Sequence, residues 1–218
     1  MKNSRRAHRN TREQIFLTAA ELFTKKGYDA VSIREICEKV GVGKPTLYYY
    51  FQDKESLLVA LIDEAYRLGF DYLSRFIMPH RDWKRKFHSL LKAASLYSRE
   101  YPALIRFFFL LPHMVLPPNV GKKVEALKRR EMDFLIDLLK EGKRAKCISK
   151  KVNLNILLVL LLGAIQLMVT KPEGSDTPYP WHEHDVEELF MFFSNNILQT
   201  ASRDASTIRH ALDQSAWK

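Results

Sequence analysis

The stretch SIREICEKVGVGKPTLYYYF, residues 32–51, decides the fold of the N-terminal part of this chain. Ser32 can cap a helix, because its hydroxyl can accept a hydrogen bond from the amide three residues on while Glu35 reaches back to the cap. Glycines at positions 41 and 43 then interrupt the helix. Pro45 suits the first turn of the next helix, where no amide partner is lost. Two short helices joined by a glycine-containing turn predict a helix-turn-helix unit.

Helical periodicity extends in both directions from this unit. Thr11 opens the preceding helix with a second capping box, TREQ, and Gly27 ends it after two lysines. Asp53 caps the helix that follows, which runs towards Phe76. The apolar residues that recur at helical spacing are expected to form the core, and they include Ile15, Leu22, Phe23, Ile33, Ile36, Cys37, Val40, Leu47, Phe51, Leu57, Leu58, Leu61 and Ile62.

The rest of the chain also reads as helical. Five further helices are predicted, at residues 81–101, 103–114, 120–146, 154–170 and 186–201. The segment between the last two contains three prolines and a glycine and is expected to be a loop. Because no run of alternating apolar and polar residues indicates a strand, we expect an all-α fold. It would comprise an N-terminal three-helix helix-turn-helix domain and a larger C-terminal helical domain.

The charge of the chain is concentrated at its N-terminus. The 218 residues carry 35 Lys and Arg against 25 Asp and Glu, a formal net charge of +10. Residues 1–12 contain five basic side chains and no acidic one, whereas residues 13–56 hold six bases against seven acids. A basic tip on a nearly neutral folded unit is typical of an arm that touches phosphate, although a solubilising tail would have the same composition.

Several classes of protein are excluded by composition. Cys37 and Cys147 are too few for a disulfide framework or a zinc knuckle. The first residues, MKNSRRAHRN, have no apolar stretch and do not resemble a secretory signal. The longest apolar run, residues 156–169, is shorter than the about 20 residues of a membrane-spanning helix. We therefore expect a cytoplasmic protein with a polyanionic partner and no membrane partner.

Three stretches carry a resemblance to a known family. They are AELFTKKGY (20–28), SIREICEKVGVGKPTLYYYF (32–51) and DKESLL (53–58). Through them the sequence resembles the TetR (tetracycline-repressor-like) family of bacterial transcription regulators. The resemblance implies a homodimeric DNA-binding repressor, associated with the nucleoid, that a small hydrophobic or aromatic effector releases from a palindromic operator. It implies no cofactor, and nothing specific matches beyond residue 58.

The resemblance assigns DNA contacts to particular side chains. Ser32 would offer its hydroxyl and the free amides of its helix to a phosphate, and Arg34 could reach a phosphate or a guanine edge. The tyrosine hydroxyl of residue 48 is expected to contact a phosphate, and Lys54 to clamp the DNA backbone. The full set of expected DNA-binding residues is Ser32, Arg34, Lys44, Pro45, Thr46, Tyr48, Tyr49, Tyr50 and Lys54, with Arg5, Arg6 and Arg9 in the adjacent minor groove. Gly43 stands where the family often has serine, so a capping hydroxyl is missing.

The C-terminal part is expected to bind the effector and to form the dimer. The predicted segments are a flexible basic arm (1–10), a helix-turn-helix DNA-binding domain (11–56), a helical effector-binding and dimerisation domain (57–201) and a polar tail (202–218). The candidate effector-binding residues are Arg106, Phe107, Phe108, His113, Phe134 and Gln166, although aromatic residues at helical spacing are more often simple core. The candidate dimer-interface residues are Leu160, Gly163, Leu167, Phe190, Phe193 and Ile197, because the last two helices are apolar on more faces than one core buries.

Two other functions stay open at this point. A non-specific or architectural nucleic-acid-binding protein would use the +10 charge without reading a sequence. A helical enzyme acting on a hydrophobic substrate would need a nucleophile and base or a metal set, and the sequence shows no such motif. The pair His182 and His184 lacks a third ligand and reads as surface histidine, so we expect no metal site and no enzyme.

Overall fold

The computed structural model describes the backbone of residues 2–169 and 183–196, and the side chains of residues 11–167 and 184–195. Within these ranges the protein is built of helices and contains no strand, as predicted. In chain order the helices are α1 (Lys2–Lys26), α2 (Ile33–Val40), α3 (Lys44–Tyr50), α4 (Lys54–Ile77), α5 (Trp83–Glu100), α6 (Pro102–Leu110), the 3₁₀ turn η1 (Leu111–His113), α7 (Pro118–Arg144), α8 (Leu154–Val169) and α9 (Glu183–Asn196).

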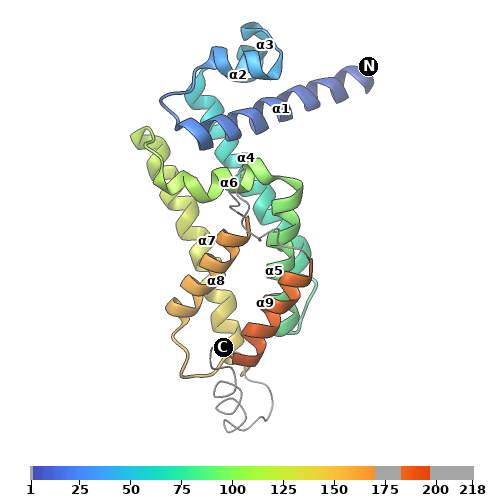
Figure 1. Ribbon diagram of the computed structural model, residues 1–218, viewed down its shortest axis with the longest axis vertical. Helices are drawn as coiled ribbons and strands as arrows, with labels where there is room; N and C mark the ends of the chain where they lie inside the picture. The colour runs from blue at the N-terminus through green and yellow to red at the C-terminus, as the bar shows by residue number, and fades with distance from the viewer. Residues whose placement is uncertain (1, 170–182, 197–218) are drawn as a thin grey trace, which may run out of the picture.

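Helices α1, α2 and α3 gather at one end of the molecule, and α4 leads from them into the rest of the chain (Figure 1). Most of the local signals behave as the sequence predicts, but Glu35 does not reach back to the cap at Ser32, because its carboxylate pairs with Lys26 on α1. The Ser32 hydroxyl accepts a hydrogen bond from the amide of Glu35 at 3.1 Å, and Gly41 ends α2 with φ +78°. Asp53 and Ser56 form a reciprocal capping box at the start of α4.

The interior of this N-terminal head consists of the residues that the periodicity selects. Leu22, Phe23, Cys37, Leu47 and Phe51 are all buried, which confirms the prediction. The two ends of the predicted α2 stripe, at positions 33 and 40, are only partly buried and pack against the edge of the core.

The start of α1 differs from the sequence-based prediction. The helix begins at Lys2 rather than at Thr11, so the capping box expected at Thr11 lies inside a continuous helix. Residues 2–10 contain neither glycine nor proline, and arginine, lysine and alanine are good helix formers. The helix can therefore continue through the predicted cap.

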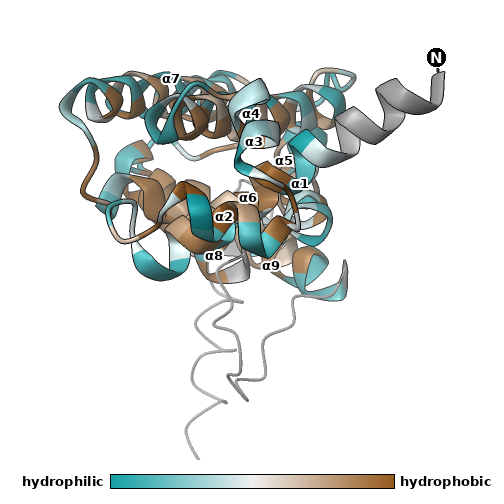
Figure 2. Ribbon diagram, turned by 90° about the horizontal axis from the view of Figure 1, so that it is seen from above, coloured by the Kyte–Doolittle hydropathy of each residue, from teal (hydrophilic) through white to brown (hydrophobic). Residues whose placement is uncertain are grey.

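The C-terminal helices form a bundle below the head (Figure 1). Helix α5 packs along α4 and also contacts α8 and α9, while α6 lies against α1 and α7 lies along α8. Figure 2 shows the ribbon of α7 alternating between hydrophilic and hydrophobic segments, as expected of a helix with one buried face. The indole N–H of Trp83 on α5 donates to the carbonyl of Leu138 on α7 at 2.6 Å, so a buried polar group is paired where the two helices meet.

Apart from the start of α1 and the end of α6, the described helix boundaries agree with the prediction to within about three residues, as is usual for such assignments. The expected single helix at 103–114 is instead α6 followed by η1, and α7 begins at Pro118. Proline fits this first turn because its missing N–H is not needed there. The predicted loop at 171–181, the end of the last predicted helix beyond 196 and the polar tail lie outside the described residues.

Among the described helices, none is by itself long and apolar enough to cross a membrane. The segments Pro102–His113 and Pro118–Arg144 meet the criterion of length and composition only as a pair, and they are bent by 110° where they join.

Candidate functional sites

The exposed face of the head is formed by α3 and the N-terminus of α2. Lys44, Pro45 and Thr46 are all exposed in the first turn of α3, and Ser32 is exposed at the cap of α2. Gly43 caps α3 without a side-chain hydrogen bond, as expected from the missing hydroxyl. The structure therefore brings four of the expected DNA-binding residues to one end of the molecule.

The three consecutive tyrosines of α3 have different environments. Tyr48 is 50% exposed and Tyr49 is 73% exposed, while Tyr50 is half-buried. The ring of Tyr50 lies edge-on to Tyr49 at 5.1 Å between centroids and 6.2 Å from that of Phe51. Because Leu47 and Phe51 are buried, the exposed positions of α3 are those that the helical period turns away from the core.

Lys54 has a different role from the one expected. Its ammonium group donates to the backbone carbonyls of Tyr28 and Val31, both at 3.0 Å, and lies 3.4 Å from that of Asp29. It also lies 4.2 Å from the centroid of the Tyr28 ring. Three carbonyls use all the N–H donors of the side chain. In this geometry Lys54 holds the loop between α1 and α2, which does not support the phosphate clamp predicted at this residue.

The other expected cations of the head are placed as follows. Arg34 is exposed and forms an ion pair of 2.7 Å with Glu38, one turn further along α2. The hydrogen bond to Glu38 raises the pKa of the Arg34 guanidinium, which stays charged. Helix α1 includes Arg5, Arg6 and Arg9, but the structure does not describe their side chains.

A cavity of about 390 Å³ lies within the C-terminal bundle, between α4, α5, α6, α7 and α8. Its walls are mostly apolar, which is typical of small-molecule sites. Its aromatic and charged lining residues include Tyr66, Arg67, Phe70, Tyr97, Phe108 and Arg130, together with Asp63, Asp71 and Glu131.

Only part of the predicted effector site belongs to this cavity. Phe108 lines it, and Phe134 stands behind it, with its ring centroid 5.6 Å from that of the lining residue Phe70. Phe107 is fully buried in the core, and Arg106, His113 and Gln166 do not line the cavity. Gln166 and His113 are exposed. The structure therefore does not bring these four to the cavity, since helical period says which residues share a face but not which neighbour that face meets.

The sequence reasoning missed most of the wall that α4 contributes. Tyr66, Phe70 and Leu73 follow one another at i, i+4 and i+7, so the stripe itself was visible as a buried face. The same pattern is expected of solid core, and nothing in it indicates a hollow. Arg130 and Glu131 on α7 carried no signal that distinguishes them from the other charged residues of that helix.

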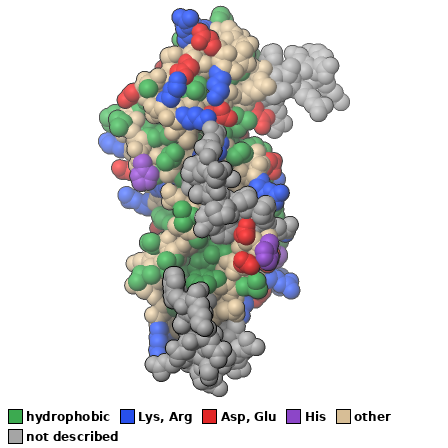
Figure 3. Space-filling view, in the orientation of Figure 1, with side chains coloured by type: hydrophobic (Ala, Val, Ile, Leu, Met, Phe, Trp, Pro, Cys, Tyr) green, Lys and Arg blue, Asp and Glu red, His purple; other side chains and the backbone are tan. Residues whose placement is uncertain are grey.

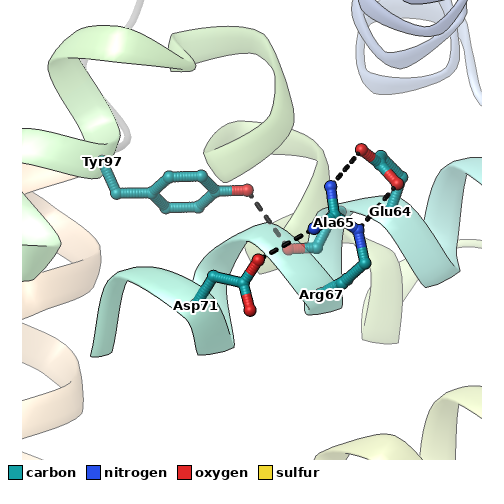
Figure 4. Close-up of polar contacts among 5 residues, drawn as sticks. All are labelled: Glu64, Ala65, Arg67, Asp71 and Tyr97. Carbon is teal, nitrogen blue, oxygen red and sulfur yellow. Dashed lines mark hydrogen bonds and ion pairs between the residues drawn. The ribbon is translucent and has the colours of Figure 1, made fainter. Parts of the chain in front are cut away.

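The polar groups on the α4 wall are held in place by hydrogen bonds (Figure 4). The Arg67 guanidinium bridges Glu64 at 2.7 Å and Asp71 at 2.8 Å along the helix. The Tyr97 hydroxyl, from α5, donates to the carbonyl of Ala65 at 3.2 Å. Burial raises the pKa of Tyr97, so this hydroxyl keeps its proton and remains a donor.

A second polar group in the wall has no such partner. The hydroxyl oxygen of Tyr66 is buried and makes no hydrogen bond. Burial raises the pKa of Tyr66, and the nearby Glu131 carboxylate raises it further. Glu131 is itself paired with Lys128 at 3.1 Å, yet burial raises the pKa of its carboxyl group. The Lys128 ammonium group lies 4.6 Å from the centroid of the Phe108 ring.

Apolar side chains remain exposed along α8 and α9. Figure 3 shows hydrophobic side chains over these helices in the lower half of the molecule. The exposed large residues there are Ile156, Val159, Leu160, Leu167, Met191 and Phe192. Of the expected dimer residues, Leu160, Gly163 and Leu167 are exposed, and Phe190 is half-buried.

Phe193, which the sequence places among the interface residues, is not exposed in this chain. It is 2% exposed, and its ring packs edge-on against Phe87 of the same chain at 5.5 Å between centroids, so it belongs to the interior of one subunit. Ile197 and His182 lie outside the described residues. His184 is exposed and lies 3.0 Å from Glu188.

The head matches a known family. Residues 15–61 match the model of the bacterial regulatory proteins of the tetR family. An uncharacterized HTH-type transcriptional regulator in the lacX 3'region of Lactococcus lactis subsp. lactis is 36% identical over 70 residues, which are 32% of this chain and 36% of that protein. IcaR, the biofilm operon icaADBC HTH-type negative transcriptional regulator of Staphylococcus aureus, is 32% identical over 71 residues, 33% of this chain and 36% of IcaR. The match thus spans about a third of the length of these curated relatives.

Solved structures extend the similarity to the whole fold. The ketosteroid transcriptional regulator KstR2 of Mycobacterium tuberculosis superposes with a TM-score of 0.73 at 14% identity, over 87% of this chain and 95% of KstR2. A TetR family transcription regulator from Marinobacter aquaeolei VT8 gives 0.66 at 20% identity, over 90% and 100%. A regulator from Saccharomonospora viridis, solved in complex with choline, gives 0.66 at 18% identity, over 88% and 99%. Residues 15–61, the N-terminal helix-turn-helix, are thus similar to the tetR family of bacterial regulatory proteins, and the chain as a whole has the fold of the solved regulators.

Proposed function

We propose that this protein is a homodimeric, DNA-binding transcriptional repressor that a small apolar effector releases from a palindromic operator. The observation that carries the proposal is the exposed face of α3, where Lys44, Thr46, Tyr48 and Tyr49 project from a helix whose other side is buried in the head. The relatives matched by the head are transcriptional regulators rather than enzymes. Such a protein acts in the cytoplasm, where it meets the bacterial nucleoid.

The chemistry of the exposed face suits the major groove of DNA. An α-helix fits this groove, and the methyl group of Thr46 or the ring of Pro45 can contact a thymine methyl. The Tyr48 hydroxyl and the Lys44 ammonium group suit phosphate oxygens. Ser32 adds the N-terminus of α2, whose amides and helix dipole favour an anion. The face thus combines positioning contacts with contacts to base edges.

A second copy of the chain is needed for a specific site of useful affinity. One α3 of seven residues reads only a few base pairs, and dimers of helix-turn-helix proteins bind two half-sites related by a two-fold axis. The exposed apolar side chains of α8 and α9 offer a surface that a second copy could bury. We therefore assign the dimer contact to Leu160, Gly163 and Leu167 on α8, with Phe190 at its edge.

The cavity has a direct mechanical connection to the head. Helix α4 forms one wall of the cavity and begins at the end of the helix-turn-helix unit. Helix α7, which forms another wall, is tied to the upper part of α4 by the hydrogen bond from Asn119 to Glu55 at 2.6 Å and by the ion pair of Lys123 with Asp63 at 2.7 Å. An effector that fits one arrangement of α4 and α7 better than another would shift the spacing of the two heads.

The proposal is tested by selecting DNA from a random pool with the purified protein. We expect a palindromic motif whose half-sites are about one helical turn apart. Tyr48→Phe should weaken binding to all selected sequences by about 1 kcal/mol, since it removes one phosphate contact. Thr46→Ala should instead change the preferred base at one position of each half-site. Enrichment of no motif, with binding that depends only on salt, would favour the non-specific alternative.

A further inference from the structure

The cavity wall holds several charged side chains, and all but one of them are paired. Arg67 is bonded to Glu64 and Asp71, Asp63 is paired with Lys123, and Glu131 with Lys128. Arg130 forms no ion pair with any carboxylate among the described residues. Of the two cations in the lining, Arg67 is held by carboxylates of its own helix, so Arg130 is the one whose guanidinium is left for a ligand.

The position of Arg130 leaves its hydrogen-bond donors accessible. Its guanidinium carbon lies 5.5 Å from the centroid of the exposed Phe70 ring, within the distance of a cation–π contact. A guanidinium has five N–H donors, and a cation–π contact occupies none of them, so they remain for a planar anion. Both residues line the cavity and are exposed, which places them at its opening.

Arg130 also lines a shallow groove on the outer surface of α7. The groove is formed by Lys122, Glu125, Ala126, Arg129, Arg130 and Asp133. Three of these side chains are basic and two are acidic, so the outer surface beside the cavity opening is slightly positive. An anion at Arg130 would thus meet no excess of negative charge from this side.

Opposite this charged opening, the interior of the cavity is apolar and aromatic. Tyr66, Tyr97, Phe108 and Phe109 contribute ring surface to a volume of about 390 Å³, which is within the range of drug-sized ligands. A fully charged ligand would lose its hydration there without compensation. A fully apolar ligand would leave the opening cation unused.

From this arrangement we infer that the effector is an amphipathic anion, with a ring-containing or otherwise bulky apolar body in the cavity and an acidic group bound by Arg130 at the opening. The binding of such a ligand does not depend on the proposed function, but its role as an effector does. The acidic group is a carboxylate or a phosphate ester, which share the oxygen geometry that an arginine binds.

The test compares two fluorescent probes that have the same rings and differ in charge. Anilinonaphthalene sulfonate carries one sulfonate, while N-phenylnaphthylamine is neutral, and both become fluorescent in an apolar site. We expect Arg130→Gln to weaken binding of the sulfonate about tenfold and to leave binding of the amine within about twofold, because only the sulfonate uses the guanidinium. Arg130→Lys should recover part of the loss, since it restores the charge without the planar fork.

Arg129→Gln is the matched control. It removes the same charge from the preceding residue of α7, and Arg129 does not line the cavity. Equal losses of sulfonate binding in the Gln variants of Arg129 and Arg130 would show a general charge effect and overturn the inference. So would equal losses of both probes in Arg130→Gln. Circular dichroism of each variant checks that the bundle is folded.

Competition with naphthoate, naphthyl phosphate and naphthol then identifies the acidic group. Displacement of the sulfonate by either anion at a concentration at least about fivefold lower than naphthol supports the inference and distinguishes carboxylate from phosphate. Displacement by naphthol as well as by the anions overturns it. These measurements use no DNA, so a failed operator selection with anion-selective binding would reject the proposed function alone. A specific operator with no preference for anions would reject this inference alone.

Discussion

The ammonium group of Lys54 lies 3.0 Å from the backbone carbonyl of Tyr28 and 4.2 Å from the centroid of its ring. The first residue of α4 thus closes the loop between α1 and α2 from inside the head. A residue whose place in the sequence suggests a contact with DNA is used here to hold the DNA-reading helices on the rest of the protein.

We predict that Lys54→Met lowers the free energy of unfolding by about 1–3 kcal/mol, because part-buried carbonyls lose their donor. The salt dependence of DNA binding should hardly change. Lys44→Met, at an exposed position of α3, should leave the free energy of unfolding nearly unchanged. It should lower the slope of log affinity against log salt by about 0.9 for each phosphate contact that is lost. Urea unfolding and DNA titrations at several salt concentrations measure both effects. A loss of slope in the Lys54 variant without loss of stability would restore the phosphate clamp.

Gly142→Ala should destabilise the bundle strongly. A Cβ atom at this position of α7 would lie 2.5 Å from an atom of the Trp83 ring and 2.8 Å from Ile148 Cδ1. The indole cannot move aside easily, because it is buried and hydrogen-bonded to Leu138. We expect a loss of about 1–3 kcal/mol in urea unfolding.

Gly121→Ala, in the same helix, is the control for Gly142→Ala. A Cβ atom there meets nothing within 4 Å, so the better helix propensity of alanine should leave stability unchanged or raise it by up to about 1 kcal/mol. Equal effects of the two substitutions would mean that the close approach of Gly142 and Trp83 is not what limits the residue at this position.

The buried carboxyl group of Glu131 should make stability depend on pH. Because burial raises its pKa in the folded state, the folded protein holds this proton more tightly than the unfolded chain does. Its contribution favours folding below the unfolded pKa of about 4.3 and is lost as the pH rises through the folded pKa. Glu131→Gln keeps a neutral side chain at every pH. The stability of this variant relative to the original protein should therefore rise as the pH increases over this interval.

Unfolding by urea at several pH values measures this difference. Asp137→Asn is the control, because Asp137 lies on the same helix but is exposed, with an ion pair to Lys140. The free energy of unfolding of Asp137→Asn, relative to the original protein, should not rise with pH in the same interval. A flat difference for Glu131→Gln would show that the carboxyl group titrates normally in the folded protein.

Charges introduced into the apolar face of α8 should separate the proposed dimer. Leu167 is 74% exposed and Val159 is 69% exposed, on the surface that we assign to a second copy. Leu167→Arg together with Val159→Arg should weaken self-association at least about thirtyfold, as expected when central residues of an interface are replaced. Sedimentation velocity at several concentrations gives the dissociation constant. Val115→Arg, at another exposed apolar position, should leave it unchanged, and an unaltered dimer in the α8 variant would place the interface elsewhere.

The helix-turn-helix could be read directly from the sequence because its signals are local. Caps at Ser32 and Asp53, glycine at 41 and proline at 45 act through atoms only a few residues apart, and the structure places each as expected. Burial of Leu47 and Phe51 followed from helical period alone. The same local logic erred at Thr11, because a capping sequence does not stop a helix when the residues before it can also be helical.

The sequence by itself therefore determined the all-helical fold, the recognition unit and which side of each short helix faces the core. The tertiary structure alone decided the partners of side chains far apart in the chain, such as Lys54 with the α1–α2 loop and Phe193 with Phe87. It also decided that the stripe through Tyr66 and Phe70 borders a cavity in which Arg130 stands unpaired. The physical reason is that a periodic apolar face predicts burial, whereas the shape left between helices depends on how several such faces fit together.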